Sequence, residues 1–110
     1  MKITMKPWGH EELLVLTDTY AMKRMVINPN SRMSLQYHEK KEETIYVVSG
    51  CLSIWESKDD QTKELFPGDV YHVKPSQIHR FGATDKQVVL IECSTTELED
   101  VVRLEDDYQR

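Results

Sequence analysis

The sequence predicts an all-β fold that forms a single domain over residues 1–110, and three observations support this prediction. The apolar stretches are short and rich in Val, Ile, Leu, Met and Tyr, several of which favour extended chain. Turn-forming residues separate these stretches at short intervals, as in β-sandwiches and β-barrels. A chain of 110 residues is long enough for one hydrophobic core and too short for two.

Taken in order, the expected strands alternate with turns along most of the chain. The strands are expected at residues 13–16, 20–27, 33–38, 44–49, 51–56, 63–65, 70–73, 79–81 and 87–93. The turns, rich in Pro, Gly, Asn, Asp and Ser, are expected at residues 28–31, 49–50, 58–61, 67–69 and 84–86. Only residues 95–104 are expected to form a short helix or an irregular tail, with Thr95 or Thr96 as the N-cap.

Charge and composition exclude several classes of function. A net charge of −5 and a pI of about 5.3 argue against nucleic acids and anionic membranes as partners, because both require clustered Lys and Arg. No apolar run has the length of a membrane span, and residues 1–6 lack the apolar core of a secretory signal. We therefore expect a cytoplasmic protein in which Cys51 and Cys93, which form no paired motif, are reduced.

The residues with the clearest chemistry lie between Gln36 and Glu43. Gln36 and His38 are two residues apart, so their side chains point to the same side of an extended strand. A hairpin through the charged turn that follows would bring Glu43 back opposite them, and His79 comes from a later segment. An amide oxygen, two imidazoles and a carboxylate can hold a divalent metal and leave positions open for a substrate. Together, Gln36, His38, Glu43 and His79 predict a metal site, although Glu42 is a rival to Glu43.

The spacing of these residues resembles the first motif of the cupin barrels, G-x5-H-x-H-x(3,4)-E-x6-G. The matching positions are Asn30, Gln36, His38, Glu43 and Gly50. Asn30 replaces the first Gly of the motif, and Gln36 replaces its first His. The resemblance implies a double-stranded β-helix, or jelly-roll barrel, with a divalent metal bound inside.

The second cupin motif, G-x5-P-x-G-x2-H-x3-N, is matched in overall length from Gly68 to His79. Its inner Pro is shifted by one position to Pro75, and Ala83 stands where the motif has Asn. These departures affect the loop but leave His79 in register as a metal ligand.

A narrower resemblance is to the C-terminal isomerase domain of type II, bifunctional mannose-6-phosphate isomerase/mannose-1-phosphate guanylyltransferases. Lys6-Pro7-Trp8-Gly9 resembles the opening of that domain, residues 33–38 resemble its LSLQ-x-H strand, and residues 47–50 resemble its VVSG turn. The closing residues 99–110 resemble EDDIVRxEDxYGR, with Gln109 where that family has Gly. The spacing of this family also selects Glu43 over Glu42.

This resemblance implies a metal-dependent isomerase that interconverts mannose 6-phosphate and fructose 6-phosphate on the route to GDP-mannose. Zn²⁺ suits the reaction, because it polarises sugar oxygens and has no redox chemistry of its own. His72 and Lys23 are the candidates for the base, and Arg80 and Arg110 are expected to hold the phosphate. We also expect a homodimer, because the N-terminal segment is long enough to add a strand to a partner's sheet edge.

Two other functions remain open at this point. One is a non-catalytic cupin module that binds a metal and a sugar but lacks a base. The other is a different cupin enzyme, such as a dioxygenase or a sugar epimerase, because one fold supports many chemistries. Gln36 argues against the dioxygenase, since an amide oxygen suits a Lewis acid better than an oxygen-activating iron.

Overall fold

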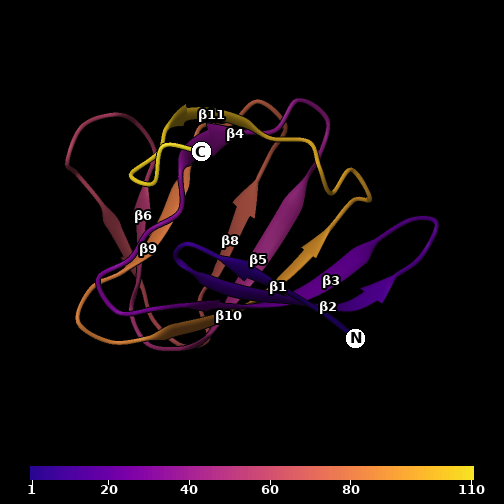
Figure 1. Ribbon diagram of the computed structural model, residues 1–110, viewed down its shortest axis with the longest axis horizontal. Coiled ribbons are helices and arrows are strands. Elements are labelled where there is room, and N and C mark those ends of the chain that lie inside the picture. Colours follow the sequence, from indigo (N-terminus) through magenta and orange to yellow (C-terminus); the bar gives the residue numbers. More distant parts are fainter.

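The computed structural model describes residues 1–110 and consists of strands joined by turns and irregular segments (Figure 1). The strands are β1 (Lys2–Lys6), β2 (Gly9–Leu16), β3 (Ala21–Ile27), β4 (Leu35–Tyr37), β5 (Glu43–Ser49), β6 (Leu52–Trp55), β7 (Lys63–Leu65), β8 (Val70–Val73), β9 (Arg80–Ala83), β10 (Val88–Ser94) and β11 (Val102–Glu105). The expectation of an all-β chain is confirmed. No helix capable of crossing a bilayer is present.

Two curved layers of strands enclose the core (Figure 1). One layer is a six-stranded sheet in the order β1-β2-β3-β10-β5-β8. The other combines a three-stranded sheet, β7-β6-β9, with the pair β11-β4. Two isolated bridges, Arg32 with Gly82 and Gln36 with His79, connect β4 and the residues before it with β9 and the residue before it. This second layer therefore places Gln36 and His79 side by side.

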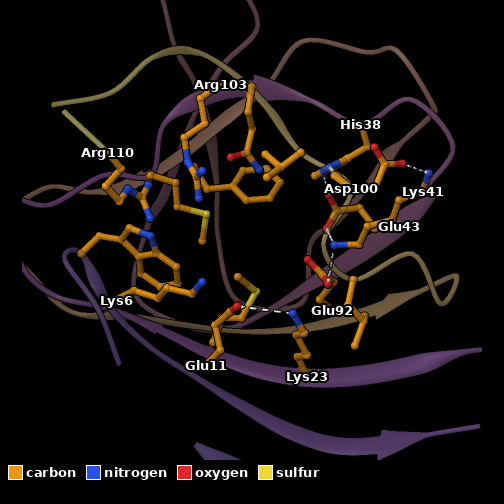
Figure 2. A pocket seen from close by; sticks show the side chains of 17 residues that line it. Lys6, Glu11, Lys23, His38, Lys41, Glu43, Glu92, Asp100, Arg103 and Arg110 are labelled. Atoms are coloured by element: carbon orange, nitrogen blue, oxygen red, sulfur yellow. Dashed lines mark hydrogen bonds and ion pairs between the residues drawn. The ribbon is translucent and has the colours of Figure 1, made fainter. Parts of the chain in front are cut away.

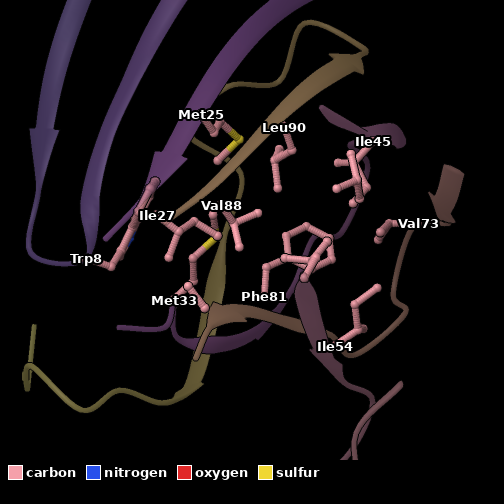
Figure 3. Close-up of a cluster of buried hydrophobic side chains, with 13 residues drawn as sticks. Trp8, Met25, Ile27, Met33, Ile45, Ile54, Val73, Phe81, Val88 and Leu90 are labelled. Atoms are coloured by element: carbon pink, nitrogen blue, oxygen red, sulfur yellow. The ribbon is translucent and has the colours of Figure 1, made fainter. Parts of the chain in front are cut away.

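Alternation along the strands determines which side chains reach the interior. In β5, Glu43, Ile45 and Val47 are buried, while the residues between them are partly or largely exposed. The core cluster is formed by apolar side chains of both layers and is shown in Figure 3. Its members are Trp8, Met25, Ile27, Met33, Ile45, Val47, Leu52, Ile54, Val73, Phe81, Ala83, Val88 and Leu90. Their burial supplies the main driving force for folding.

Most predicted strands are present with shifts of one or a few residues at their ends, and the N-terminal segment is the main addition. Residues Lys2–Lys6 form β1, an antiparallel edge strand beside β2. The segment that we expected to extend a partner's sheet thus extends the sheet of its own chain.

Of the two forms expected for residues 95–104, a short helix or an irregular tail, the helix is absent. This stretch is irregular up to residue 101 and then forms β11, which pairs with β4. The polar groups expected to cap a helix bind another turn instead, because Thr95 Oγ1 accepts the N–H of Glu42 at 3.0 Å. The carboxylate of Asp100 accepts the N–H groups of residues 39–41 at 2.7–3.0 Å. Two adjacent β-branched residues, Val101 and Val102, further favour extended chain.

Two positions of the family motifs have a left-handed backbone. Asn30, which replaces the first Gly of the cupin motif, has a φ of 57°, and Asn tolerates this conformation better than most residues do. Gln109, which replaces Gly in the closing motif, has a φ of 55°. The chain therefore keeps the turn at both positions, at a conformational cost for Gln109 of about 1 kcal/mol.

Candidate metal centre

Three of the four predicted metal ligands meet in the interior at one end of the barrel. His38 follows β4, Glu43 begins β5, and His79 precedes β9. Their ligand atoms lie within 4.8 Å of one another, and all three side chains are buried. Glu43 Oε1 is 2.9 Å from His38 Nε2 and 3.4 Å from His79 Nε2. The antiparallel bridge between Gln36 and His79 holds β4 next to the segment that precedes β9. Its two hydrogen bonds have N to O distances of 3.0 and 2.9 Å.

The second nitrogen of each imidazole defines its tautomer. His38 Nδ1 lies 2.6 Å from the carbonyl oxygen of Asp100, and His79 Nδ1 lies 3.0 Å from that of Gln77. A carbonyl oxygen only accepts, so each Nδ1 carries the proton and each neutral ring presents the lone pair of Nε2. Both lone pairs are directed at the carboxylate of Glu43, which also only accepts.

This convergence of acceptors tests whether the residues fit a metal ion. No donor pairs with the buried His79 Nε2 or with Glu43 Oε2, which have no hydrogen-bond partner. Unpartnered buried polar atoms are costly, and a divalent cation among two imidazole nitrogens and a carboxylate satisfies all of them. Backbone carbonyls that orient both imidazoles from behind are also typical of metal-ligating histidines. The residues present therefore fit a divalent metal.

Gln36 lines the same cavity as His38 and Glu43. Its Oε1 accepts the hydroxyl of the fully buried Ser34 at 2.7 Å, which fixes the position of the amide. An amide oxygen has a second lone pair, so this bond leaves Gln36 able to ligate. The rival Glu42 points away from the centre and lies on the surface, 2.8 Å from His72. The geometry therefore selects Glu43 rather than Glu42.

Two buried charged residues beside the centre were missed by the sequence analysis. Lys41 Nζ lies 3.2 Å from Glu92 Oε2 and 3.9 Å from Glu43 Oε2, and the three side chains are almost fully buried. Glu92 had a signal in the sequence: it continues the inward positions Val88 and Leu90 of an apolar strand. Lys41 had none, because it belongs to a run of charged residues that looks like a solvated turn.

Burial and mutual charge separate the pKa values of these groups. Burial, together with the nearby negative charge of Glu43, raises the pKa of Glu92 well above its usual value. Burial alone would also raise the pKa of Glu43, but its contacts with Glu92, His38 and His79 and the charge of Lys41 lower it well below its usual value. Glu43 is thus held as the carboxylate that a metal requires.

A cavity extends from this centre and opens to solvent (Figure 2). His38, Lys41, Glu43 and Glu92 lie on one side of the cavity, and Lys6, Arg103 and Arg110 lie on the other. Apolar side chains such as Met25 and Phe81 also line it. The arrangement places a metal centre, titratable groups and cations around one shared cavity.

Of the predicted catalytic residues, Lys23 and Arg110 lie at the cavity. Lys23 Nζ is 3.3 Å from Glu11 Oε2, and this pair forms part of the wall contributed by β2 and β3. Arg110 Nε is 2.9 Å from Asp106 Oδ2, and its side chain lies beside the cavity mouth (Figure 2).

The other two predicted residues lie elsewhere. His72 is on the outer face of β8, because Tyr71 and Val73 take the inward positions, and its ring contacts Thr44 Oγ1 and Glu42 Oε2 at 2.9 and 2.8 Å. Arg80 is buried beside β11, 3.0–3.2 Å from the backbone and the carboxylate of Glu105. Neither lines the cavity. The structure thus corrects the expectations that His72 is a base and that Arg80 holds phosphate.

A comparison with protein families identifies the family of this chain. The family described as "Mannose-6-phosphate isomerase C-terminal" matches residues 2–106. The chain belongs to this family. As a member of the mannose-6-phosphate isomerase C-terminal family, it is 28% identical over 109 residues to the alginate biosynthesis protein AlgA of Pseudomonas aeruginosa. It is 29% identical over 109 residues to the mannose-1-phosphate guanylyltransferase of Escherichia coli. The alignments cover 96% of this chain but only 22% of each of those proteins, so the chain spans about a fifth of these relatives.

Solved structures confirm the cupin fold of this family member. An RmlC-like cupin from Shewanella frigidimarina superposes with a TM-score of 0.75 at 19% identity, covering 89% of this chain and 86% of that one. The polyketide cyclase RemF from Streptomyces resistomycificus superposes with a TM-score of 0.82 at 20% identity, covering 94% and 78%. The chain is therefore a cupin barrel built around the candidate metal centre.

Proposed function

We propose that this cupin is a metal-dependent isomerase that interconverts mannose 6-phosphate and fructose 6-phosphate. The observation that carries the proposal is the convergence of His38, Glu43 and His79 on one point at the end of a cavity lined by cations. The family match supports the reaction class. The relative named as a mannose-1-phosphate guanylyltransferase supports a place in the supply of activated mannose, since mannose 6-phosphate is one isomerisation away from mannose 1-phosphate.

His38, Glu43 and His79, with Gln36, would hold a divalent ion, most simply Zn²⁺. When bound, such an ion polarises the oxygens on C1 and C2 of the sugar and stabilises the charge that develops on them. Glu43 contributes the only ligand charge, so the centre keeps a net positive charge.

The isomerisation moves one proton between two adjacent carbon atoms without any redox change. The base must lie in the cavity, and His72 does not. Lys23 and Glu92 line the cavity and are titratable, and Lys41 lies against Glu92. The apolar residues Met25, Met33 and Phe81 keep part of the wall dry, which strengthens the electrostatic interactions inside. We further propose that the protein acts in the cytoplasm as a homodimer, with a small hexose phosphate as its ligand.

A turnover experiment tests the proposal directly. Purified protein is loaded with Zn²⁺ and incubated with mannose 6-phosphate in D₂O, and both fructose 6-phosphate and loss of the C2 proton are followed by NMR. We expect both signals to change together, to stop after chelation and to return when Zn²⁺ is restored. Fully loaded protein that binds the sugar phosphate but exchanges no proton would instead be a binding module. Consumption of O₂ with an iron-loaded protein would point to a dioxygenase.

A further inference from the structure

Two cations at the cavity have no partner, although every other cation that lines it is paired. Lys23 pairs with Glu11, Lys41 with Glu92, and Arg110 with Asp106. Lys6 and Arg103 line the cavity, and no carboxylate lies within ion-pairing distance of either. Unpaired cations that share a concave wall repel one another, so an anion bound between them is favoured.

The strand register fixes where these two cations stand. Arg103, in β11, is the cross-strand partner of Gln36 in β4, so the two side chains are direct neighbours on one face. Lys6 ends β1 opposite Gly9, at the turn that also places Trp8 in the cavity wall. Figure 2 shows Lys6, Arg103 and Arg110 gathered on one side of the cavity, across from His38 and Glu43. Cations and metal ligands therefore occupy opposite sides of the same space.

The positive lining continues beyond this cavity. An adjoining hollow shares Lys6, Lys23 and Arg103 with it and adds Lys2 at the outer edge. Its carboxylates are Glu11, which already pairs with Lys23, and Glu99. The uncompensated positive charge is thus concentrated at Lys6 and Arg103, and it faces the solvent through which a charged ligand enters.

The chemistry of the two side chains suits a phosphate group. The guanidinium of Arg103 can donate two parallel N–H bonds to a pair of phosphate oxygens, while the ammonium of Lys6 supplies a point charge from β1. A sugar carboxylate would be a poorer match, because one negative charge cannot compensate two cations from two elements.

We propose that Lys6 and Arg103 form the subsite that binds the phosphate of the substrate and selects sugar monophosphates over neutral sugars. The identity of the sugar rests on the proposed function, whereas the subsite does not require that the protein be a catalyst. The subsite replaces the assignment of Arg80, which is committed to Glu105. Arg110 stands beside it with its charge already shared with Asp106.

The test compares binding of fructose 6-phosphate, fructose and inorganic phosphate to Zn²⁺-loaded protein by calorimetry. The variants are Lys6→Gln, Arg103→Gln and Arg103→Lys, and Lys74→Gln, on an exposed turn, serves as the control. We expect Lys6→Gln and Arg103→Gln each to weaken binding of fructose 6-phosphate and of phosphate by about tenfold or more. The affinity of Arg103→Lys for both ligands should lie between those of wild type and Arg103→Gln. Binding of fructose, zinc content and the Lys74→Gln control should not change.

Equal binding of fructose 6-phosphate to wild type and to both Gln variants would overturn the subsite, and so would absence of any preference for fructose 6-phosphate over fructose. Loss of zinc from Arg103→Lys, which keeps the charge and the strand, would show that Arg103 serves the metal centre instead. The two proposals fail separately. A protein that binds phosphate through Lys6 and Arg103 but exchanges no C2 proton retains the subsite and loses the isomerase. A protein that turns over equally well in all variants retains the isomerase and loses the subsite.

Discussion

Glu43 is the only predicted metal ligand that carries a charge, and it is buried beside a second carboxyl group. Its neighbours keep its pKa low, while Glu92 takes the raised pKa of the pair. The charges of the centre are therefore arranged so that one acid is ionised and the other holds its proton more easily. This division is common where two acids share a buried site and have different tasks.

Replacing Glu43 by Gln should remove the metal, and the adjacent Glu42 offers a matched control. Both changes remove one carboxylate from the same run of residues, but only Glu43 faces the two imidazoles, whereas Glu42 contacts His72 on the surface. We expect Glu43→Gln to lower zinc affinity by at least about 100-fold, and Glu42→Gln to leave it unchanged. Competition for zinc with a chromophoric chelator measures the zinc affinity of each variant. Similar affinities for the two variants would contradict the assignment of the centre.

Lys41 should be essential to the stability of the metal-free protein. Its ammonium is the only cation within ion-pairing distance of Glu92 and it also lies near Glu43, so Lys41→Met leaves two buried acids without compensation. We expect the free energy of unfolding in the presence of a chelator to fall by about 3–5 kcal/mol, measured by urea denaturation. The double variant Lys41→Met/Glu92→Gln should recover a large part of this loss. If it is no more stable than Lys41→Met, the coupling between the two residues is absent.

At the scale of elements, local patterns predicted what the chain forms but not always where its side chains point. The strands at Lys63–Leu65 and Val70–Val73 have the predicted bounds, because turn residues flank them on both sides. In Val70–Val73, however, apolar residues occupy both faces, so the sequence did not show that His72 points outward. The failed helix has a similar cause, because the N–H groups that Thr95 and Asp100 bind belong to residues 39–42, far away in the sequence.

The C-terminal segment should loosen in acid before the rest of the barrel. Arg32 binds the carboxylate of Asp107 through two nitrogens, at 2.6 and 2.9 Å, and lowers the pKa of Asp107. Arg110 and the backbone N–H groups of residues 108 and 110 lower the pKa of Asp106, against the opposing effect of its burial. A carboxyl group whose pKa is lower in the folded state contributes its stability above the unfolded pKa, and this contribution is lost as pH falls through the folded pKa. The loosening should therefore begin below a pH of about 4.

Hydrogen exchange measures the loosening of the C-terminal segment. The protein is first freed of metal with a chelator, so that release of metal in acid does not interfere. Amides of residues 102–110 should exchange a few-fold faster relative to the core amides of β5 as pH falls below that range. In Asp107→Asn the segment should already be looser at neutral pH, and its remaining change on acidification should be smaller. A segment whose exchange follows that of β5 at every pH would show that it opens only when the whole molecule unfolds.

At the scale of the molecule, the metal site is made by segments that lie far apart in the sequence. Spacing placed Gln36, His38 and Glu43 together, and the cupin motif added His79 from a distant strand. The wall opposite the metal ligands was not predictable in the same way. Lys6 and Arg103 come from β1 and β11, and nothing in their local sequence shows that their side chains share one cavity. Tertiary pairing alone brings them to one cavity.

The predicted homodimer should form through the outer face of the six-stranded sheet. Tyr46, Val48 and Val70 on β5 and β8 are 48%, 45% and 59% exposed, and Tyr46 is paired directly with Val70. Neighbouring exposed apolar side chains on a sheet face mark a candidate interaction surface. We expect light scattering to give the mass of a dimer at micromolar concentration, and Val48→Lys/Val70→Lys to give a monomer that still binds zinc, because both residues point away from the cavity. Gln61→Lys/Gln87→Lys adds the same charge at two exposed positions outside this patch and should remain dimeric. A wild-type monomer would reject the dimer, while a dimer that survives Val48→Lys/Val70→Lys must use another surface, such as the edge formed by β1.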